Sequence, residues 1–98
     1  MANSLRSATF LIESRLEDAA RGDYSACYDL GILYSTGAAG VEIDLIEAHK
    51  WFNLAAVGGS EAAQRCRADI SEDMTAREIA EAQKQARAFL QLNARRAA

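Results

Sequence analysis

The chain has 98 residues, a formal net charge of -3, 26% charged side chains, 21 alanines and no proline. Alanine favours helices and proline breaks them, so this composition predicts an almost wholly helical, all-α fold and disfavours a β-sandwich, a barrel or a disordered chain. The length fits one small domain over residues 1–98, and the negative net charge is untypical of a nucleic-acid-binding protein.

Hydrophobic periodicity and capping residues predict about five helices. The first is an N-terminal helix over residues 7–20, and the second covers residues 23–35. The core-facing positions of the first helix are Ala8, Ile12, Leu16 and Ala19. Those of the second helix are Ala26, Leu30, Leu33 and Tyr34. The spacing within each set places its members on one side of a helix, which is expected to face the core.

A loop is expected over residues 36–43, where Gly37 and Gly40 supply positive φ angles. Asp44 is expected to cap the third helix, and Asp44 together with Glu47 resembles a capping box with Asp in place of Ser. This helix ends at Gly58. Its apolar stripe consists of Leu45, Ala48, Phe52 and Ala55.

Ser60 is expected to cap a fourth, shorter helix that ends near residue 71. Thr75 and Glu78 form a capping box that opens the last helix, which continues through Phe89. The apolar stripe of this helix consists of Ile79, Ala82, Ala86 and Phe89. All these stripes are interpreted as core rather than as a cofactor-binding motif, and no cofactor is expected.

Residues 22–26 recur at residues 59–63, at an offset of 37 positions. In both copies a glycine precedes a capping Asp or Ser, and an alanine follows four residues after the glycine. Glycines repeated at such a period are typical of a solenoid built from helix pairs. Small residues are expected where the paired helices approach closely, and larger ones fill the remaining space. The small positions are Ala26, Gly31, Ala55 and Ala56, and the large ones are Leu30, Tyr34 and Trp51.

The spacing of these residues closely resembles the Sel-1-like repeat, a relative of the tetratricopeptide repeat. The positions that carry the resemblance are Gly22, Ala26, Leu30, Gly31, Tyr34, Gly37, Gly40, Asp44, Ala48, Trp51, Ala55, Ala56, Gly59 and Ala63. The resemblance implies an antiparallel helix-pair solenoid, a tetratricopeptide-like superhelix, and a non-catalytic adaptor role in protein–protein interaction. It divides the chain into an N-terminal helix (1–21), a full repeat (22–58), a degenerate second repeat (59–72) and a C-terminal capping helix (73–98).

The chain departs from the pattern of this family in several places. The loop after the second helix has one residue more than usual, and Arg67, Ala68 and Ser71 stand where the second repeat would have leucine, glycine and tyrosine. A secreted branch of the family has disulfide cysteines at the positions of Ala56 and Ala63. The chain is therefore expected to belong to the reduced, cytoplasmic type.

Few side chains are available for chemistry. Cys27 and Cys66 lie far apart in the sequence and have no CxxC partner, so they are expected to act as small apolar residues and not to bind a metal. His49 is the only histidine; it is expected to face either the solvent or the groove edge between helices, as a surface residue without an acid–base partner. No catalytic or phosphate-binding motif occurs, so no enzymatic activity is expected, and neither a secretory signal nor a membrane span is expected.

The resemblance places partner binding on the concave face of the solenoid. That face would present Ser25, Tyr28, Ile32 and Ser35 from the second helix, and Arg65 and Asp69 from the fourth. Tyr28 and Ile32 are the expected anchors, because an aromatic and an aliphatic side chain on a polar surface suit a peptide groove. Arg65 could pair with a carboxylate of the ligand. The alternative interpretation is that this face is ordinary solvated helix surface.

Self-association as a homo-oligomer is an alternative function. Residues 1–49 carry three basic and eight acidic side chains, whereas residues 50–98 carry eight basic and six acidic ones. No acid follows Glu81, while four basic residues do, namely Lys84, Arg87, Arg95 and Arg96. These either complement the dipole of their own helix or contact an acidic partner, including the acidic half of a neighbouring copy. The chain also has fewer than the three repeats that usually bury a continuous core.

A helix-turn-helix DNA-binding regulator is a second, less favoured alternative. Residues 75–80 superficially resemble the opening of such a motif, and the basic residues near the end could contact phosphates. The last helix, however, continues through Phe89 without a glycine turn, and the chain is acidic. Neither a nucleic acid nor a membrane is therefore expected as a partner.

Overall fold

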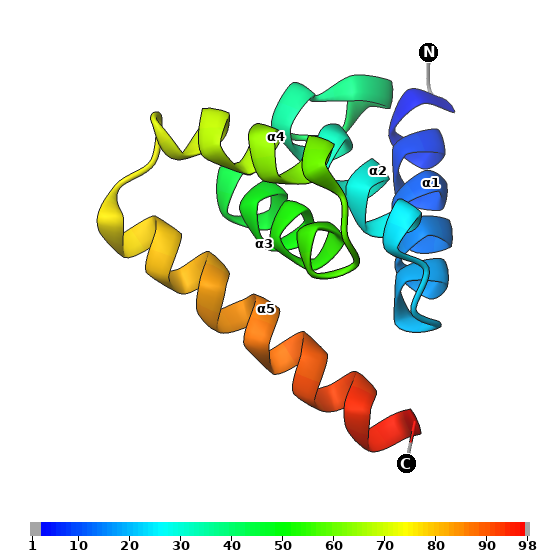
Figure 1. Ribbon diagram of the computed structural model, residues 1–98. Helices are drawn as coiled ribbons and strands as arrows, with labels where there is room; N and C mark the ends of the chain where they lie inside the picture. Colours follow the sequence, from blue (N-terminus) through cyan, green and yellow to red (C-terminus); the bar gives the residue numbers. More distant parts are fainter. Residues whose placement is uncertain (1–2, 98) are drawn as a thin grey trace.

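The computed structural model describes the backbone of residues 3–97 and the side chains of residues 7–95 (Figure 1). Within that part of the chain it contains no strand, which confirms the predicted all-α class. The elements are α1 (Asn3–Ala20), α2 (Tyr24–Thr36), the short 3-10 turn η1 (Ala38–Gly40), α3 (Leu45–Val57), α4 (Glu61–Ser71) and α5 (Ala76–Ala97). Within residues 3–97, no helix is both long enough and apolar enough to cross a lipid bilayer.

Helix α3 lies at the centre of the molecule, and α2, α4 and α5 all pack against it (Figure 1). Helix α1 packs on α2 and lies at the opposite side of the molecule from most of α5. The buried residues of α3 are Ala48, His49, Trp51, Phe52, Leu54 and Ala55. A helix that is covered from several directions must bury more than one apolar stripe. The sequence of α3 has enough apolar residues to do so.

The α2–α3 pair is held at close range by Gly31 and Phe52. A Cβ atom on Gly31 would lie 2.5 Å from Cε1 of the Phe52 ring, which is fully buried, so only glycine fits at this point of α2. Leu30 beside it has no exposed surface. Trp51, the neighbour of Phe52 in the sequence, faces α5 and meets Phe89 edge to face, with ring centroids 5.1 Å apart.

The helix starts follow the predicted caps, with one correction. Asp44 Oδ1 accepts a hydrogen bond from the backbone N–H of Glu47 at 3.1 Å. The Glu47 carboxylate does not return to Asp44, because it accepts from Trp51 Nε1 at 2.9 Å and from Lys50 Nζ at 3.2 Å. The Asp44 N–H donates instead to the carbonyl oxygen of Tyr34 at 2.9 Å. The capping box predicted here is therefore only half formed, since a buried indole one turn further along competes for Glu47.

The remaining predicted caps are confirmed. Ser60 Oγ accepts from the N–H of Ala63 at 3.0 Å. Thr75 and Glu78 form the full reciprocal box, with distances of 3.1 and 2.8 Å between backbone nitrogen and side-chain oxygen. Gly37 and Gly40 have positive φ angles of 75° and 82° as predicted. Helix α5 extends to Ala97, further than the predicted stripe required.

Two predicted burials are wrong. Leu16 was expected in the core, yet 37% of its surface is exposed, because only one side of α1 is covered. His49 was expected at the surface, yet only 3% of it is exposed, because α3 is surrounded by α2, α4 and α5. Tyr34, Ile79 and Phe89 are half-buried members of the predicted stripes.

Candidate functional site

The candidate partner surface is the outer side of α2, with α1 on one flank and α4 on the other. A hollow of about 460 Å³ opens between α1 and α2. It is lined by Leu11, Arg15, Tyr28, Asp29, Ile32 and Leu33, and is called here the α1–α2 hollow. Its floor is apolar, and its edge carries an ion pair between Arg15 Nη1 and Asp29 Oδ2 at 3.4 Å. Both predicted anchors, Tyr28 and Ile32, therefore belong to this hollow.

Tyr28 connects the α1–α2 hollow with α4. Its ring packs on Phe52 with centroids 5.8 Å apart, and its hydroxyl lies against the thiol of Cys66. The neighbouring Cys66 thiol, together with partial burial, raises the pKa of Tyr28. The guanidinium of Arg65 lies near enough to act on the same hydroxyl in the opposite direction. Tyr28 is thus a neutral phenol at the boundary between an apolar hollow and a basic side chain.

The structure brings together only some of the predicted partner-binding residues. Tyr28 and Ile32 line the same hollow, and Arg65 lies outside that lining but near enough to Tyr28 to act on its hydroxyl. The hydroxyl of Ser25 donates to Asp23 Oδ1 at 2.8 Å, and that of Ser35 donates to the Ile32 carbonyl at 3.2 Å, so both are used within α2. Asp69 is exposed on α4, one turn beyond Arg65, and no described contact joins it to the others.

The α1 wall of the α1–α2 hollow was not predicted from the sequence. Leu11 and Arg15 come from a helix that carries none of the repeat motif, and Asp29 was not selected although it lies beside Tyr28. Arg15 has a second acidic partner, because its Nη2 atom lies 3.6 Å from Asp18 Oδ2. The opposite charges of Arg15 and Asp29 were the available signal, but only the packing of α1 on α2 brings them together.

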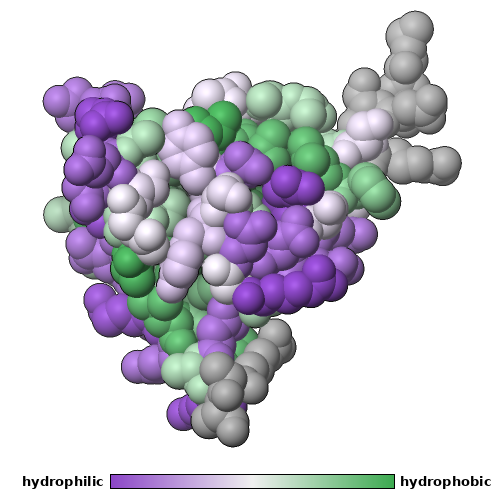
Figure 2. Space-filling view, turned by 45° about the vertical axis from the view of Figure 1, so that its right-hand side comes forward, coloured by the Kyte–Doolittle hydropathy of each residue, from purple (hydrophilic) through white to green (hydrophobic). Residues whose placement is uncertain are grey.

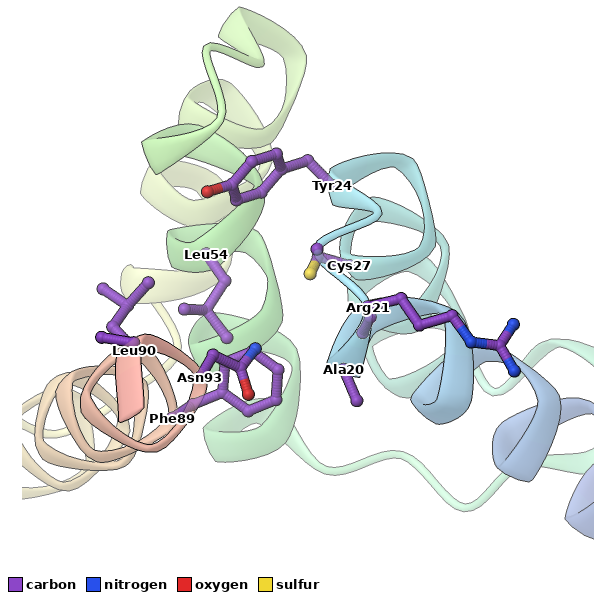
Figure 3. Close-up of a pocket in the computed structure, with 11 residues that line it drawn as sticks. Ala20, Arg21, Tyr24, Cys27, Leu54, Phe89, Leu90 and Asn93 are labelled. Carbon is purple, nitrogen blue, oxygen red and sulfur yellow. The ribbon is translucent and has the colours of Figure 1, made fainter. Parts of the chain in front are cut away.

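A second hollow lies where the end of α1 and the start of α2 face α3 and the C-terminal half of α5 (Figure 3). It also measures about 460 Å³ and is called here the α5 hollow. Its lining residues are Ala19, Ala20, Arg21, Gly22, Tyr24, Cys27, Leu54, Phe89, Leu90, Asn93 and Ala94. Figure 3 shows that the Arg21 guanidinium points away from the hollow, so the wall is mainly apolar.

The polar side chains that line the α5 hollow include Tyr24, Cys27 and Asn93. Cys27 is a free cysteine, and its burial raises the pKa of the thiol to about 11, which keeps it protonated and weakly nucleophilic at neutral pH. Asn93 Oδ1 is buried and has no hydrogen-bond partner among the described residues. A ligand group that donates a hydrogen bond could satisfy this oxygen.

His49 belongs to α3 and is buried by the helices that pack around α3. Its Nδ1 atom is buried without a hydrogen-bond partner in the described part of the chain. Burial and the nearby positive charge of Arg67 lower the pKa of His49. Arg67 in turn donates from Nη1 to Asn53 Oδ1, which ties α4 to α3. The imidazole is therefore held in its neutral form by the fold.

The free energy of unfolding is expected to fall as the pH drops below 6.5, the ordinary pKa of histidine. In this range the unfolded chain protonates its histidine while the folded chain resists doing so, so acid favours unfolding. The loss is at most about 1.4 kcal/mol for each pH unit. Urea unfolding of the wild type and of His49→Gln, from about pH 7 to about pH 5, checks this. Equal pH slopes for the two proteins would contradict it.

The fold and its surface define a small all-helical protein with two apolar hollows, one beside α1 and one beside α5. Comparison with known proteins finds no matching family model, and no curated protein or solved structure that is significantly similar to this chain. The likeness to the Sel-1-like repeat therefore rests on the motif residues themselves.

Proposed function

We propose that this protein is a non-catalytic protein–protein interaction module of the Sel-1-like repeat type, which binds a peptide or protein segment on the outer face of α2. The observation that carries the proposal is the convergence of Tyr28 and Ile32 in an open hollow of about 460 Å³, with Arg65 close to the Tyr28 hydroxyl. An aromatic and an aliphatic side chain beside a cation are typical of the anchors that dominate binding energy at interfaces.

The geometry of the motif residues supports the repeat assignment. Gly31 allows the close approach of α2 and α3, as a helix pair requires. The positive φ angles of Gly22 and Gly59, 92° and 100°, occur at equivalent places before α2 and before α4. We interpret residues 22–58 as the full repeat, followed by a degenerate one in α4, with α1 and α5 covering the two ends. The solenoid arrangement is part of this proposal.

The side chains at the α1–α2 hollow favour a partner segment that has an apolar side chain and a carboxylate. The floor of the α1–α2 hollow would take an apolar side chain, which gains free energy by leaving water. Arg15 already faces Asp18 and Asp29, whereas Arg65 has no ion pair among the described residues. Arg65 is thus the cation available to a ligand carboxylate. The free thiols of Cys27 and Cys66 suit a reducing compartment, and we propose the cytoplasm.

Binding of peptides selected from a random displayed library is expected to weaken at least about tenfold when Tyr28 and Ile32 are both replaced by alanine. The replacement removes the two apolar anchors of the hollow. Because Tyr28 also packs on Phe52, Arg65→Glu is a second variant that reverses a charge at the exposed edge without touching the core. It is expected to weaken binding of acidic peptides in particular. Titration calorimetry of the full chain with the selected peptides measures both effects.

Arg95→Glu provides the matched control, because Arg95 is an exposed cation on α5, outside the lining of the α1–α2 hollow. It is expected to leave peptide affinity unchanged. Circular dichroism of each variant verifies that the helices are retained. The proposal fails if folded Tyr28→Ala/Ile32→Ala and Arg65→Glu proteins bind the selected peptides as tightly as the wild type.

A further inference from the structure

An aromatic side chain stands out from the surface of α1. Phe10 has 72% of its surface exposed and points away from α2, which α1 covers with its other side. Glu13 and Glu17 are also exposed, and at spacings of three and seven residues they lie on the same side of the helix as Phe10. The outer side of α1 therefore combines one large apolar group with two negative charges.

The α5 hollow has the complementary character. Leu54, Phe89 and Leu90 supply apolar wall, and the cavity of about 460 Å³ has room for an aromatic side chain. Arg87 lies three residues before Leu90, on the flank of the same helix side, and it is exposed without an ion pair among the described residues. No acidic residue follows Glu81 on α5, so this flank of the hollow is basic.

The two surfaces lie at different places on the molecule. The space-filling view shows hydrophobic side chains, drawn in green, gathered toward the top of the view and again toward its lower left (Figure 2). Helix α1 reaches the α5 hollow only with its last residues, Ala19 and Ala20, whereas Phe10 lies about two and a half turns earlier on that helix. A single copy does not bring Phe10 into the α5 hollow, since Phe10 is exposed and is not among the residues that line it.

We propose that the protein associates with further copies of itself head to tail, with Phe10 of one copy seated in the α5 hollow of the next. Burial of Phe10 removes apolar surface from water on both copies, and Glu13 and Glu17 then lie near the basic flank at Arg87. The chain thus carries both halves of one interface, an acidic apolar ridge and a basic apolar hollow. This contact uses neither Tyr28 nor Ile32, so it is independent of the proposed partner face.

A head-to-tail contact of this kind would assemble the copies into chains or rings. The two surfaces differ, so the interface is heterologous, and each added copy leaves one ridge and one hollow free. Such association continues into longer chains unless the rotation between copies closes a ring. Because opposite charges contribute, the association is expected to weaken as salt is raised.

Sedimentation equilibrium of the full chain over a concentration series tests the proposal. The average mass of the wild type is expected to rise with protein concentration, and to rise less at about 0.5 M salt than at about 0.05 M salt. Phe10→Ala is expected to weaken association at least about tenfold, since it removes the aromatic group that the hollow buries. Ala94→Trp, at an exposed position that lines the hollow, is expected to block the same contact from the other side.

Mixing the two variants separates this interface from any other. Phe10→Ala retains the hollow and Ala94→Trp retains the ridge, so an equimolar mixture is expected to form heterodimers and nothing larger. Ile43→Ala and Gln91→Trp are matched controls, because both positions are exposed and neither lines the α5 hollow. The proposal is overturned if the wild type remains monomeric throughout the series, if Phe10→Ala associates like the wild type, or if the mixture stays monomeric.

Discussion

Replacement of Trp51 by alanine is expected to lower the free energy of unfolding by about 3–5 kcal/mol. Trp51 is 2% exposed, lies edge to face with Phe89 of α5, and donates from Nε1 to Glu47 at 2.9 Å. The substitution opens a cavity between α3 and α5 and removes the donor of Glu47, which is left facing Lys50. Domains of this size are stable by only about 5–15 kcal/mol, so much of the total is lost.

Chemical denaturation followed by circular dichroism measures the effect of Trp51→Ala, because tryptophan fluorescence disappears with the residue. Phe10→Ala is the matched aromatic control, and at 72% exposure its effect on monomer stability is expected to stay within about 0.5 kcal/mol. Trp51→Phe is expected to lie between the two, since it retains much of the ring contact but not the N–H donor. Similar losses for Trp51→Ala and Phe10→Ala would contradict the central position of Trp51 in the core.

Gly31→Ala is expected to destabilise the protein by about 1–3 kcal/mol. In an unconstrained helix the same change stabilises by up to about 1 kcal/mol, because alanine is the better helix former. Here the new Cβ would lie 2.5 Å from Cε1 of Phe52, whose ring is fully enclosed and has no space into which to move. The sign of the measured change therefore reports directly on the close packing of α2 against α3.

Gly58→Ala is a closely matched control for Gly31→Ala. Its Cβ would approach Cγ of Tyr24 more closely than the Gly31 Cβ approaches any atom of Phe52, but the Tyr24 ring is 43% exposed and the whole side chain can turn aside. Its expected effect is within about 0.5 kcal/mol. The double variant Gly31→Ala/Phe52→Leu is expected to cost less than the sum of its single changes, because the smaller side chain relieves the clash. Thermal unfolding of the four variants and the wild type tests this, and strict additivity would argue against the clash.

Local features of the fold were predictable from short stretches of sequence. The caps at Ser60 and Thr75 and the positive φ of Gly37 depend on residues within a few positions of one another. The capping box at Asp44 was predicted only in part, because the Glu47 side chain had a second partner within reach. That partner, Trp51, also lies nearby in the sequence, but its burial depends on α5.

Burial around α1 and α3 was harder to predict. His49 stands beside a clear apolar stripe and was placed at the surface, yet α3 is covered on so many sides that its neighbouring stripe is also buried. A signal was present, since Trp51, Phe52, Leu54 and Ala55 are too many apolar residues for one face. Leu16 shows the opposite error, because a stripe predicts a face but not how far a neighbouring helix covers it.

Short stretches of the sequence specify the helical class, the caps that start α3, α4 and α5, and the small residue at Gly31 that a paired helix requires, whereas α1 begins at Asn3, four residues before its predicted start. These follow from interactions within a turn or two of the backbone, whose energies belong to the local residues. The covered sides of α1 and α3 depend instead on how the helices pack, and so does the fact that Arg15 and Tyr28 share one hollow while Tyr24 and Leu90 share another. The reason is that a hollow is the space left where residues distant in the chain pack imperfectly, and that space depends on all the helices at once.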